Sequence, residues 1–129
     1  MTAQALLQAN AAFYEAFAQR DVERLCSLWA RDAEIACIHP GWPAVHGRPA
    51  VLESWRGIFG GNPPEIAVTD ARAYVYGETG FVICTELLPG GTLVATNVFV
   101  LEAGEWRLVH HQAGPAPDIE LPEPTGPLH

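Results

Sequence analysis

The fold is decided by residues 65–111, EIAVTDARAYVYGETGFVICTELLPGGTLVATNVFVLEAGEWRLVHH. Apolar and polar side chains alternate through much of this stretch, and three glycine-containing turns interrupt it. Alternation with a period of two between such turns is typical of antiparallel β-hairpins. We therefore predict four consecutive strands, at about residues 65–76, 80–88, 92–102 and 105–113.

The residues before this stretch have helical periodicity instead. Apolar side chains recur at intervals of three and four residues from Leu6 to Ala18, from Val22 to Trp29 and from Val51 to Phe59, which predicts three helices. Asp21 is placed to cap the second helix, and Pro49 lies in the first turn of the third, where its missing N–H is not needed.

A short strand is predicted between the second and third helices, at residues 32–39. Its alternation places Ile35, Cys37 and His39 on one face, and the following proline ends it. Helices gathered first and an antiparallel meander afterwards indicate an α+β fold, with the helices against one face of the sheet.

The composition limits what the chain can do. With 129 residues and 49% hydrophobic side chains, there is room for one domain with a sizeable core. The net charge is −8, there is no lysine and no basic run, so we expect neither nucleic-acid nor membrane partners. No stretch resembles a secretory signal or a membrane span, and the three cysteines lie in apolar contexts without metal or redox spacing. We expect buried thiols and a cytoplasmic location.

Two parts of the chain differ in composition. Residues 1–114 form the predicted domain, whereas residues 115–129 contain five prolines and have no periodicity. We expect the second part to be an extended or disordered tail.

A set of residues gives the chain a resemblance to a known superfamily. They are Phe13-Tyr14-x-x-Phe17-x-x-x-Asp21, Leu28-Trp29-x-x-Asp32-Ala33, His39-Pro40, Gly47-Arg48, Trp55 and Trp106-Arg107-Leu108-Val109-His110-His111. Over roughly residues 2–113 the chain resembles the nuclear transport factor 2-like superfamily, and within it the SnoaL-like and ketosteroid-isomerase-like bacterial proteins. The resemblance implies a cone-shaped fold, in which three N-terminal helices pack against a strongly curved, mostly antiparallel sheet and enclose a pocket.

The same resemblance suggests three catalytic candidates. His39 precedes Pro40, where ketosteroid isomerases carry a proton-shuttling aspartate, and an imidazole titrating near neutral pH could serve as the base. Asn97 falls where those enzymes hold an acid that donates to an oxyanion, and an amide can also donate. Tyr14 lies on the helix that carries their oxyanion tyrosine. The structural alternatives are a buried histidine bonded to a carbonyl, a cross-sheet hydrogen bond of Asn97 and core packing of Tyr14.

Five further side chains are candidates for contacts with a ligand: Trp42, Trp55, Phe59, Phe99 and His110. His110 and His111 must point to opposite faces of their strand, and we place His110 inward, on the face shared with Trp106 and Leu108. No spacing indicates a metal site, and no cofactor is expected.

Two functions remain open from the sequence. The first is a cofactor-free isomerase, cyclase or dehydratase that moves a proton next to the carbonyl group of a small apolar compound. The second is a non-catalytic ligand-binding or dimerisation module. The strand 92–102 is apolar on both faces, which is typical of a strand covered on both sides. We therefore also expect a homodimer through the outer sheet face.

Overall fold

Three helices precede the main sheet in the computed structural model, which describes residues 2–116. They are α1 (Ala3–Ala18), α2 (Val22–Ser27) and α3 (Arg48–Gly60). The predicted cap of the second helix is present, since the Asp21 carboxylate accepts a hydrogen bond from the Arg24 N–H at 3.1 Å. The predicted tail lies outside the described residues from residue 117 onward.

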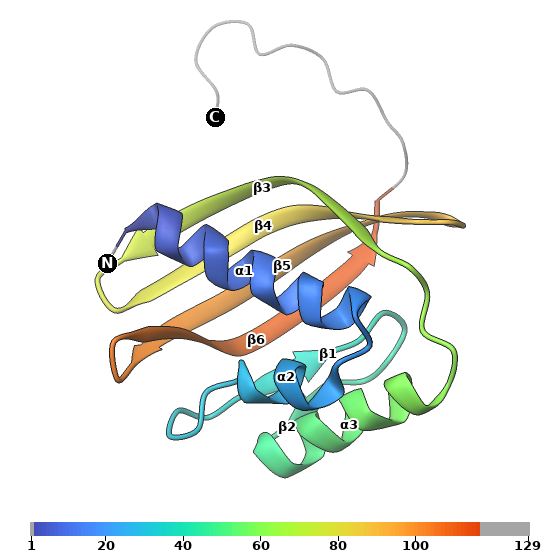
Figure 1. Cartoon of the computed structure of the whole chain (residues 1–129), viewed down its shortest axis with the longest axis horizontal. Coiled ribbons are helices and arrows are strands. Elements are labelled where there is room, and N and C mark those ends of the chain that lie inside the picture. The colour runs from blue at the N-terminus through green and yellow to red at the C-terminus, as the bar shows by residue number, and fades with distance from the viewer. Residues whose placement is uncertain (1, 117–129) are drawn as a thin grey trace, which may run out of the picture.

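Six strands form one sheet in the order β2-β1-β6-β5-β4-β3. They are β1 (Ala36–Ile38), β2 (Val45–His46), β3 (Ala67–Tyr76), β4 (Thr79–Leu88), β5 (Gly91–Glu102) and β6 (Glu105–Pro115). Strands β3 to β6 form the predicted antiparallel meander, while β1 runs parallel to β6. The sheet curves behind α1, with α2 and α3 at the side of β1 and β2 (Figure 1). The predicted α+β class is confirmed.

The strand predicted at residues 32–39 is shorter than expected. Only Ala36–Ile38 pair with neighbouring strands, because the preceding backbone has a different partner. The Glu102 carboxylate accepts hydrogen bonds from the N–H groups of Arg31, Asp32 and Ala33, at 2.9, 3.0 and 3.0 Å. The short β2, which pairs with β1, was not predicted.

The core lies between α1 and the concave face of the sheet, and α1 approaches β4 closely at Gly80. A Cβ atom placed on Gly80 would lie 2.6 Å from Leu6 Cδ2 and 3.0 Å from the Tyr74 carbonyl oxygen. Any larger residue would therefore require the Leu6 side chain and the neighbouring backbone of β3 to shift. The three cysteines are free and buried, as expected.

A β-bulge between β5 and β6 changes which side chains face the core. Val98 is opposite His110, but Phe99 is opposite Leu108, so Val109 is the extra residue of β6. An extra residue reverses the inward and outward alternation beyond it. Trp106 and Leu108 are buried before the bulge, and His111 is buried after it. His110 instead is half-buried and contacts the Ala36 carbonyl oxygen through Nδ1 at 3.0 Å. The prediction that His110 faces inward is wrong.

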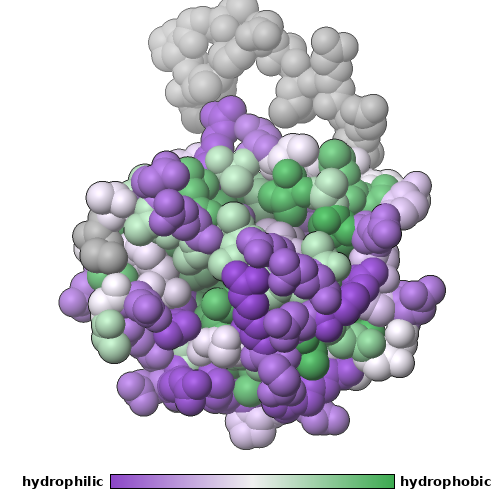
Figure 2. All heavy atoms as spheres, in the orientation of Figure 1, coloured by the Kyte–Doolittle hydropathy of each residue, from purple (hydrophilic) through white to green (hydrophobic). Residues whose placement is uncertain are grey.

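The two sides of the molecule differ in polarity. Hydrophilic residues cover much of the lower part of the helix side, over α2 and α3 (Figure 2). On the outer sheet face, by contrast, large apolar side chains are exposed; they are Tyr74, Tyr76, Ile83, Leu87 and Val94. No helix among the described residues is long and apolar enough to cross a membrane.

Candidate functional site

A cavity of about 330 Å³ lies between α1, α3, the loop after β1 and the concave face of the sheet. This volume is at the lower end of the range for small-molecule sites, roughly 300–1,000 Å³. Its walls are mainly apolar, with aromatic side chains from Phe13, Phe17, Trp42 and Trp55. Four polar side chains also line it: Tyr14, His39, Glu86 and His111.

The cavity brings together part of the predicted site. Tyr14, His39, Trp42 and Trp55 line it. His39 packs edge-to-face between the last two, with ring centroids 4.8 Å from Trp42 and 4.6 Å from Trp55. Trp42 is 45% exposed, so it forms part of the mouth rather than the base.

Three other candidates lie elsewhere. Phe59 packs edge-on against Phe17, with centroids 5.3 Å apart, outside the cavity lining. Phe99 is fully buried in the core. Asn97 is also fully buried, one layer behind the cavity wall.

The group that sequence reasoning missed is Glu86, a carboxyl group on the inner face of β4. It is only 3% exposed, and its Oε2 accepts a hydrogen bond from the Tyr14 hydroxyl at 2.6 Å. Burial raises the pKa of Glu86, and the hydrogen bond from Tyr14 partly offsets this effect. Burial, followed by the charge of Glu86, raises the pKa of Tyr14 as well, so the phenol keeps its proton.

A hydrogen-bonded chain connects Glu86 to His111 through Tyr14 and Asn97. The Asn97 Nδ2 group donates to the Tyr14 hydroxyl at 3.1 Å and to Asn10 Oδ1 at 2.8 Å. The Asn97 Oδ1 atom is bonded to His111 Nδ1. Both amide hydrogens of Asn97 and the hydroxyl hydrogen of Tyr14 are thus committed to protein acceptors. Neither residue has a free donor for a ligand, which argues against the oxyanion roles expected from the sequence.

His39 is held by α3. Its Nε2 atom lies 2.9 Å from Ser54 Oγ, and that hydroxyl donates to the Val51 carbonyl oxygen at 2.6 Å. Because the only hydrogen of the hydroxyl is committed there, Nε2 carries the imidazole proton and Nδ1 keeps a lone pair. The Cys37 thiol is 3.9 Å from Nδ1. Burial lowers the pKa of His39 to about 4, below the near-neutral value expected, so the ring is neutral at pH 7.

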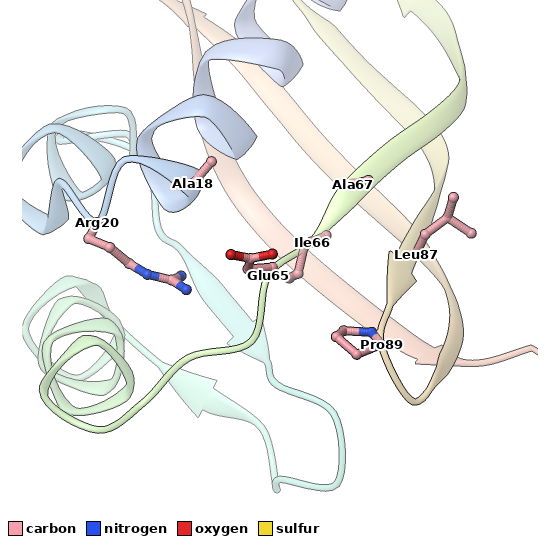
Figure 3. Close-up of a pocket in the computed structure, with 7 residues that line it drawn as sticks. All are labelled: Ala18, Arg20, Glu65, Ile66, Ala67, Leu87 and Pro89. Atoms are coloured by element: carbon pink, nitrogen blue, oxygen red, sulfur yellow. The ribbon is translucent and has the colours of Figure 1, made fainter.

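A second hollow, of about 500 Å³, borders the rim of the cavity and shares Ile66 with it. Arg20 and Glu65 extend toward each other across it (Figure 3). Arg20 is already committed, because its guanidinium donates to the carbonyl oxygens of Pro63 at 2.8 Å and Pro64 at 3.4 Å. Arg20 thereby connects the end of α1 to the loop before β3, and its role in this hollow is structural.

No cluster of three or more histidine, cysteine, aspartate or glutamate side chains able to hold a metal ion occurs among residues 2–116.

The residues missed had signals in the sequence. Glu86 follows Val82 and Cys84 at intervals of two residues, so it shares their face of a predicted strand. Asn10 lies four residues after Leu6, on the apolar face of the first helix. A polar residue at a core position needs a partner. In the structure, Asn10 pairs with Asn97, another buried polar residue, and Glu86 pairs with Tyr14.

Comparisons with known proteins agree with this geometry. Residues 6–117 match the SnoaL-like domain family. The chain is 37% identical to a Streptomyces avermitilis protein of the NTF2-like family, described provisionally as a dehydratase, with a TM-score of 0.81 over 88% of this chain and 95% of that one. It is 35% identical to a Thiobacillus denitrificans protein, described provisionally as an association domain of calcium/calmodulin-dependent protein kinase type II. There the TM-score is 0.77, over 84% of this chain and 92% of that one.

One curated relative is larger than this chain. The F-box protein SKIP8 from Arabidopsis thaliana is 26% identical over 115 residues, which make up 87% of this chain and 50% of that protein. The chain therefore spans about half the length of that relative.

Proposed function

The chain belongs to the SnoaL-like domain family within the NTF2-like proteins, and from this premise we propose that its inner cavity transfers a proton on a small, largely apolar carbonyl compound. The observation that carries the proposal is Glu86, a carboxyl group with a raised pKa in an aromatic-walled cavity. Buried carboxyl groups with raised pKa values serve as proton donors and acceptors in enzymes.

Glu86 in its protonated form is the donor in this proposal. Tyr14 holds the Oε2 atom, so the acid proton lies on Oε1 and is donated to the carbonyl oxygen of the ligand. His39 Nδ1, which keeps its lone pair, takes the proton from the neighbouring carbon. The C–H electron pair becomes the carbon–carbon double bond of an enol, and Glu86 is left as a carboxylate beside an imidazolium. In an isomerisation the enol O–H proton returns to Glu86 and the imidazolium delivers its proton to a different carbon of the conjugated enol. In an elimination the O–H proton likewise returns to Glu86, the carbonyl and a new carbon–carbon double bond form as the bond to the leaving group breaks, and the imidazolium protonates that group.

The test is hydrogen exchange at carbon, which requires no knowledge of the natural substrate. We expect the protein to speed deuterium incorporation next to the carbonyl of 2-tetralone in D₂O, followed by NMR. Glu86→Gln keeps an acceptor for Tyr14 but has no acid proton, and it should lower the rate by about 10²-fold or more.

Glu78→Gln is the matched control, because Glu78 is exposed in the β3–β4 turn. It should exchange tetralone at the parent rate. Thermal unfolding of all three proteins shows whether Glu86→Gln is folded. No acceleration by the parent protein, or equal rates for the parent and a folded Glu86→Gln variant, would contradict the proposal.

One observation supports an alternative function as a dimerisation module. The outer sheet face exposes Tyr74 at 39%, Ile83 at 37% and Val94 at 43%, and Phe81 stacks on Tyr74 with centroids 4.8 Å apart. Contiguous apolar surface of this kind is typical of an interaction site, and one similar protein is described as an association domain. The two functions are compatible, since a homodimer through this face leaves the inner cavity free.

A further inference from the structure

Two polar atoms at the ends of the hydrogen-bonded chain from Glu86 to His111 have no hydrogen-bond partner within residues 2–116. Tyr14 occupies Oε2 of Glu86 and Asn97 occupies Nδ1 of His111, which leaves Glu86 Oε1 and His111 Nε2. In the described part of the chain, the polar side-chain atoms that are fully buried without a partner are the indole nitrogens of three tryptophans. Oε1 and Nε2 therefore keep accessible surface, and since both residues line the cavity, these atoms open onto it.

The hydrogen bond with Asn97 determines which ring nitrogen of His111 carries the hydrogen and which one faces the cavity as an acceptor. Its Nδ1 atom faces the carbonyl oxygen of the Asn97 amide, and a carbonyl oxygen can only accept. The imidazole hydrogen is therefore on Nδ1, and Nε2 carries a lone pair. Burial, with smaller contributions from His39 and His110, lowers the pKa of His111 to about 3, so Nε2 remains an acceptor at neutral pH.

The charge of the cavity lining also restricts which ligands can bind. None of the described side chains that line it is an arginine, and the chain has no lysine. A carboxylate or phosphate bound there would be removed from water without a counter-charge and would lie near the Glu86 carboxyl group. Burying an unpaired anion in this way is strongly unfavourable.

We propose that His111 is a specificity-determining residue, whose Nε2 atom accepts a hydrogen bond from a hydroxyl or N–H group of the ligand. The pocket then selects uncharged, ring-containing molecules that carry such a donor and rejects carboxylates. This inference rests on the site of the proposed function and adds a second polar contact to the one made by Glu86. A hydroxy-carbonyl compound satisfies both contacts, with its carbonyl at Glu86 and its hydroxyl at His111.

Three matched bicyclic probes test the inference by isothermal titration calorimetry near neutral pH: 2-naphthol, 2-methoxynaphthalene and 2-naphthoate. They share one aromatic body and differ in offering a donor, no donor or a negative charge. We expect the parent protein to bind 2-naphthol about 3- to 10-fold more tightly than 2-methoxynaphthalene, the usual worth of one hydrogen bond. We expect 2-naphthoate to bind at least about 10-fold more weakly than 2-naphthol.

The variant His111→Asn keeps an N–H group near the Nδ1 position for Asn97 and lacks Nε2. It should bind 2-naphthol and 2-methoxynaphthalene equally. His46→Asn, at an exposed histidine of β2, is the control and should keep the parent preference. Equal binding of the two neutral probes by the parent, absence of binding by both, tight binding of 2-naphthoate, or an unchanged preference in a folded His111→Asn variant would overturn the inference.

Tetralone has no hydrogen-bond donor, so its exchange reports on Glu86 and His39 without His111. A preference for 2-naphthol without tetralone exchange supports the ligand class and contradicts the proposed reaction. Tetralone exchange without that preference supports the reaction and contradicts the ligand class.

Discussion

Tyr14 controls how readily Glu86 gives up its proton. Its hydroxyl is the hydrogen-bond donor that lowers the pKa of Glu86 and partly opposes the effect of burial. It also accepts one of the two Asn97 amide hydrogens, at 3.1 Å. Removing the hydroxyl therefore changes both the acidity of Glu86 and the pairing of a buried amide.

We predict that Tyr14→Phe shifts the pH dependence of tetralone exchange. Without the hydroxyl, the pKa of Glu86 rises further, and because the protonated form is the donor, exchange persists to higher pH than in the parent. The unpaired Asn97 hydrogen should cost about 1–3 kcal/mol of the free energy of unfolding. A pH–rate profile and a urea titration measure the two effects.

Tyr76→Phe is the control for this prediction, since Tyr76 is 66% exposed on β3. It should leave the profile and the stability unchanged. A rate that rises with pH through the Glu86 titration, instead of falling, would show that the ionised form is the active one, and a Tyr14→Phe profile that moves to lower pH would contradict the effect of the hydroxyl on the pKa of Glu86.

For the polar site residues, the sequence predicted their positions on the strands but not their hydrogen bonds. Period-two alternation correctly placed His39 and Asn97 on inner faces. The protonation of His39 could not be predicted, because it depends on Ser54, fifteen residues later on α3. Similarly, the sequence left open whether Asn97 donates to a ligand or to the protein, because the residues that accept its two hydrogens, Asn10 and Tyr14, lie on the distant first helix.

At the scale of elements, Glu102 connects the end of β5 to the segment after α2. Its carboxylate accepts from three successive backbone N–H groups, of Arg31, Asp32 and Ala33, and these bonds lower its pKa. A group whose pKa is lowered by folding stabilises the fold above its ordinary titration range and loses this effect as the pH falls through its folded value.

We predict that Glu102→Gln lowers the Tm by about 2–4 °C near neutral pH, a small loss because the carboxylate is mostly solvated. As the pH falls through the lowered pKa of Glu102, the parent carboxylate is protonated as well, so the difference between the two proteins should shrink. Differential scanning calorimetry over a series of acidic and neutral pH values measures it. Glu53→Gln, at an exposed position of α3, should match the parent throughout. A difference that grows at low pH would contradict this role.

The hairpins were the most predictable elements, and the pairing register inside β6 was the least predictable feature. Turn residues and alternation lie in the local sequence, so β3 to β6 could be assigned within two residues of their bounds. The bulge at Val109 could not, because pairing with β5 on one side and β1 on the other decides it. That single feature caused the incorrect orientation of His110.

At the scale of the whole molecule, the outer sheet face and the inner cavity lie on opposite sides of the same strands. Val94, at 43% exposure, belongs to the exposed apolar patch, whereas Ala95 beside it is fully buried. Contacts on the outer face can therefore be changed without altering the side chains that line the cavity.

We predict that the parent chain is a dimer in solution and that Val94→Glu makes it a monomer, because an unpaired carboxylate within an apolar interface is strongly unfavourable. Size-exclusion chromatography with light scattering measures both masses. Gln8→Glu adds the same charge on the exposed side of α1 and should remain a dimer. A monomeric parent, or a dimeric Val94→Glu, would exclude this face as the interface.

The bulge at Val109 also bears on how this pocket can diversify in evolution. The bulge decides whether His110 or His111 faces the ligand, so a slip in pairing that took Val109 into the regular strand would exchange the two neighbours in a single event. It would also turn Gln112, instead of Ala113, toward the interior. Relatives with the same dipeptide of histidines but without the bulge would thus present a different chemical surface to their ligands, although no amino acid had been substituted.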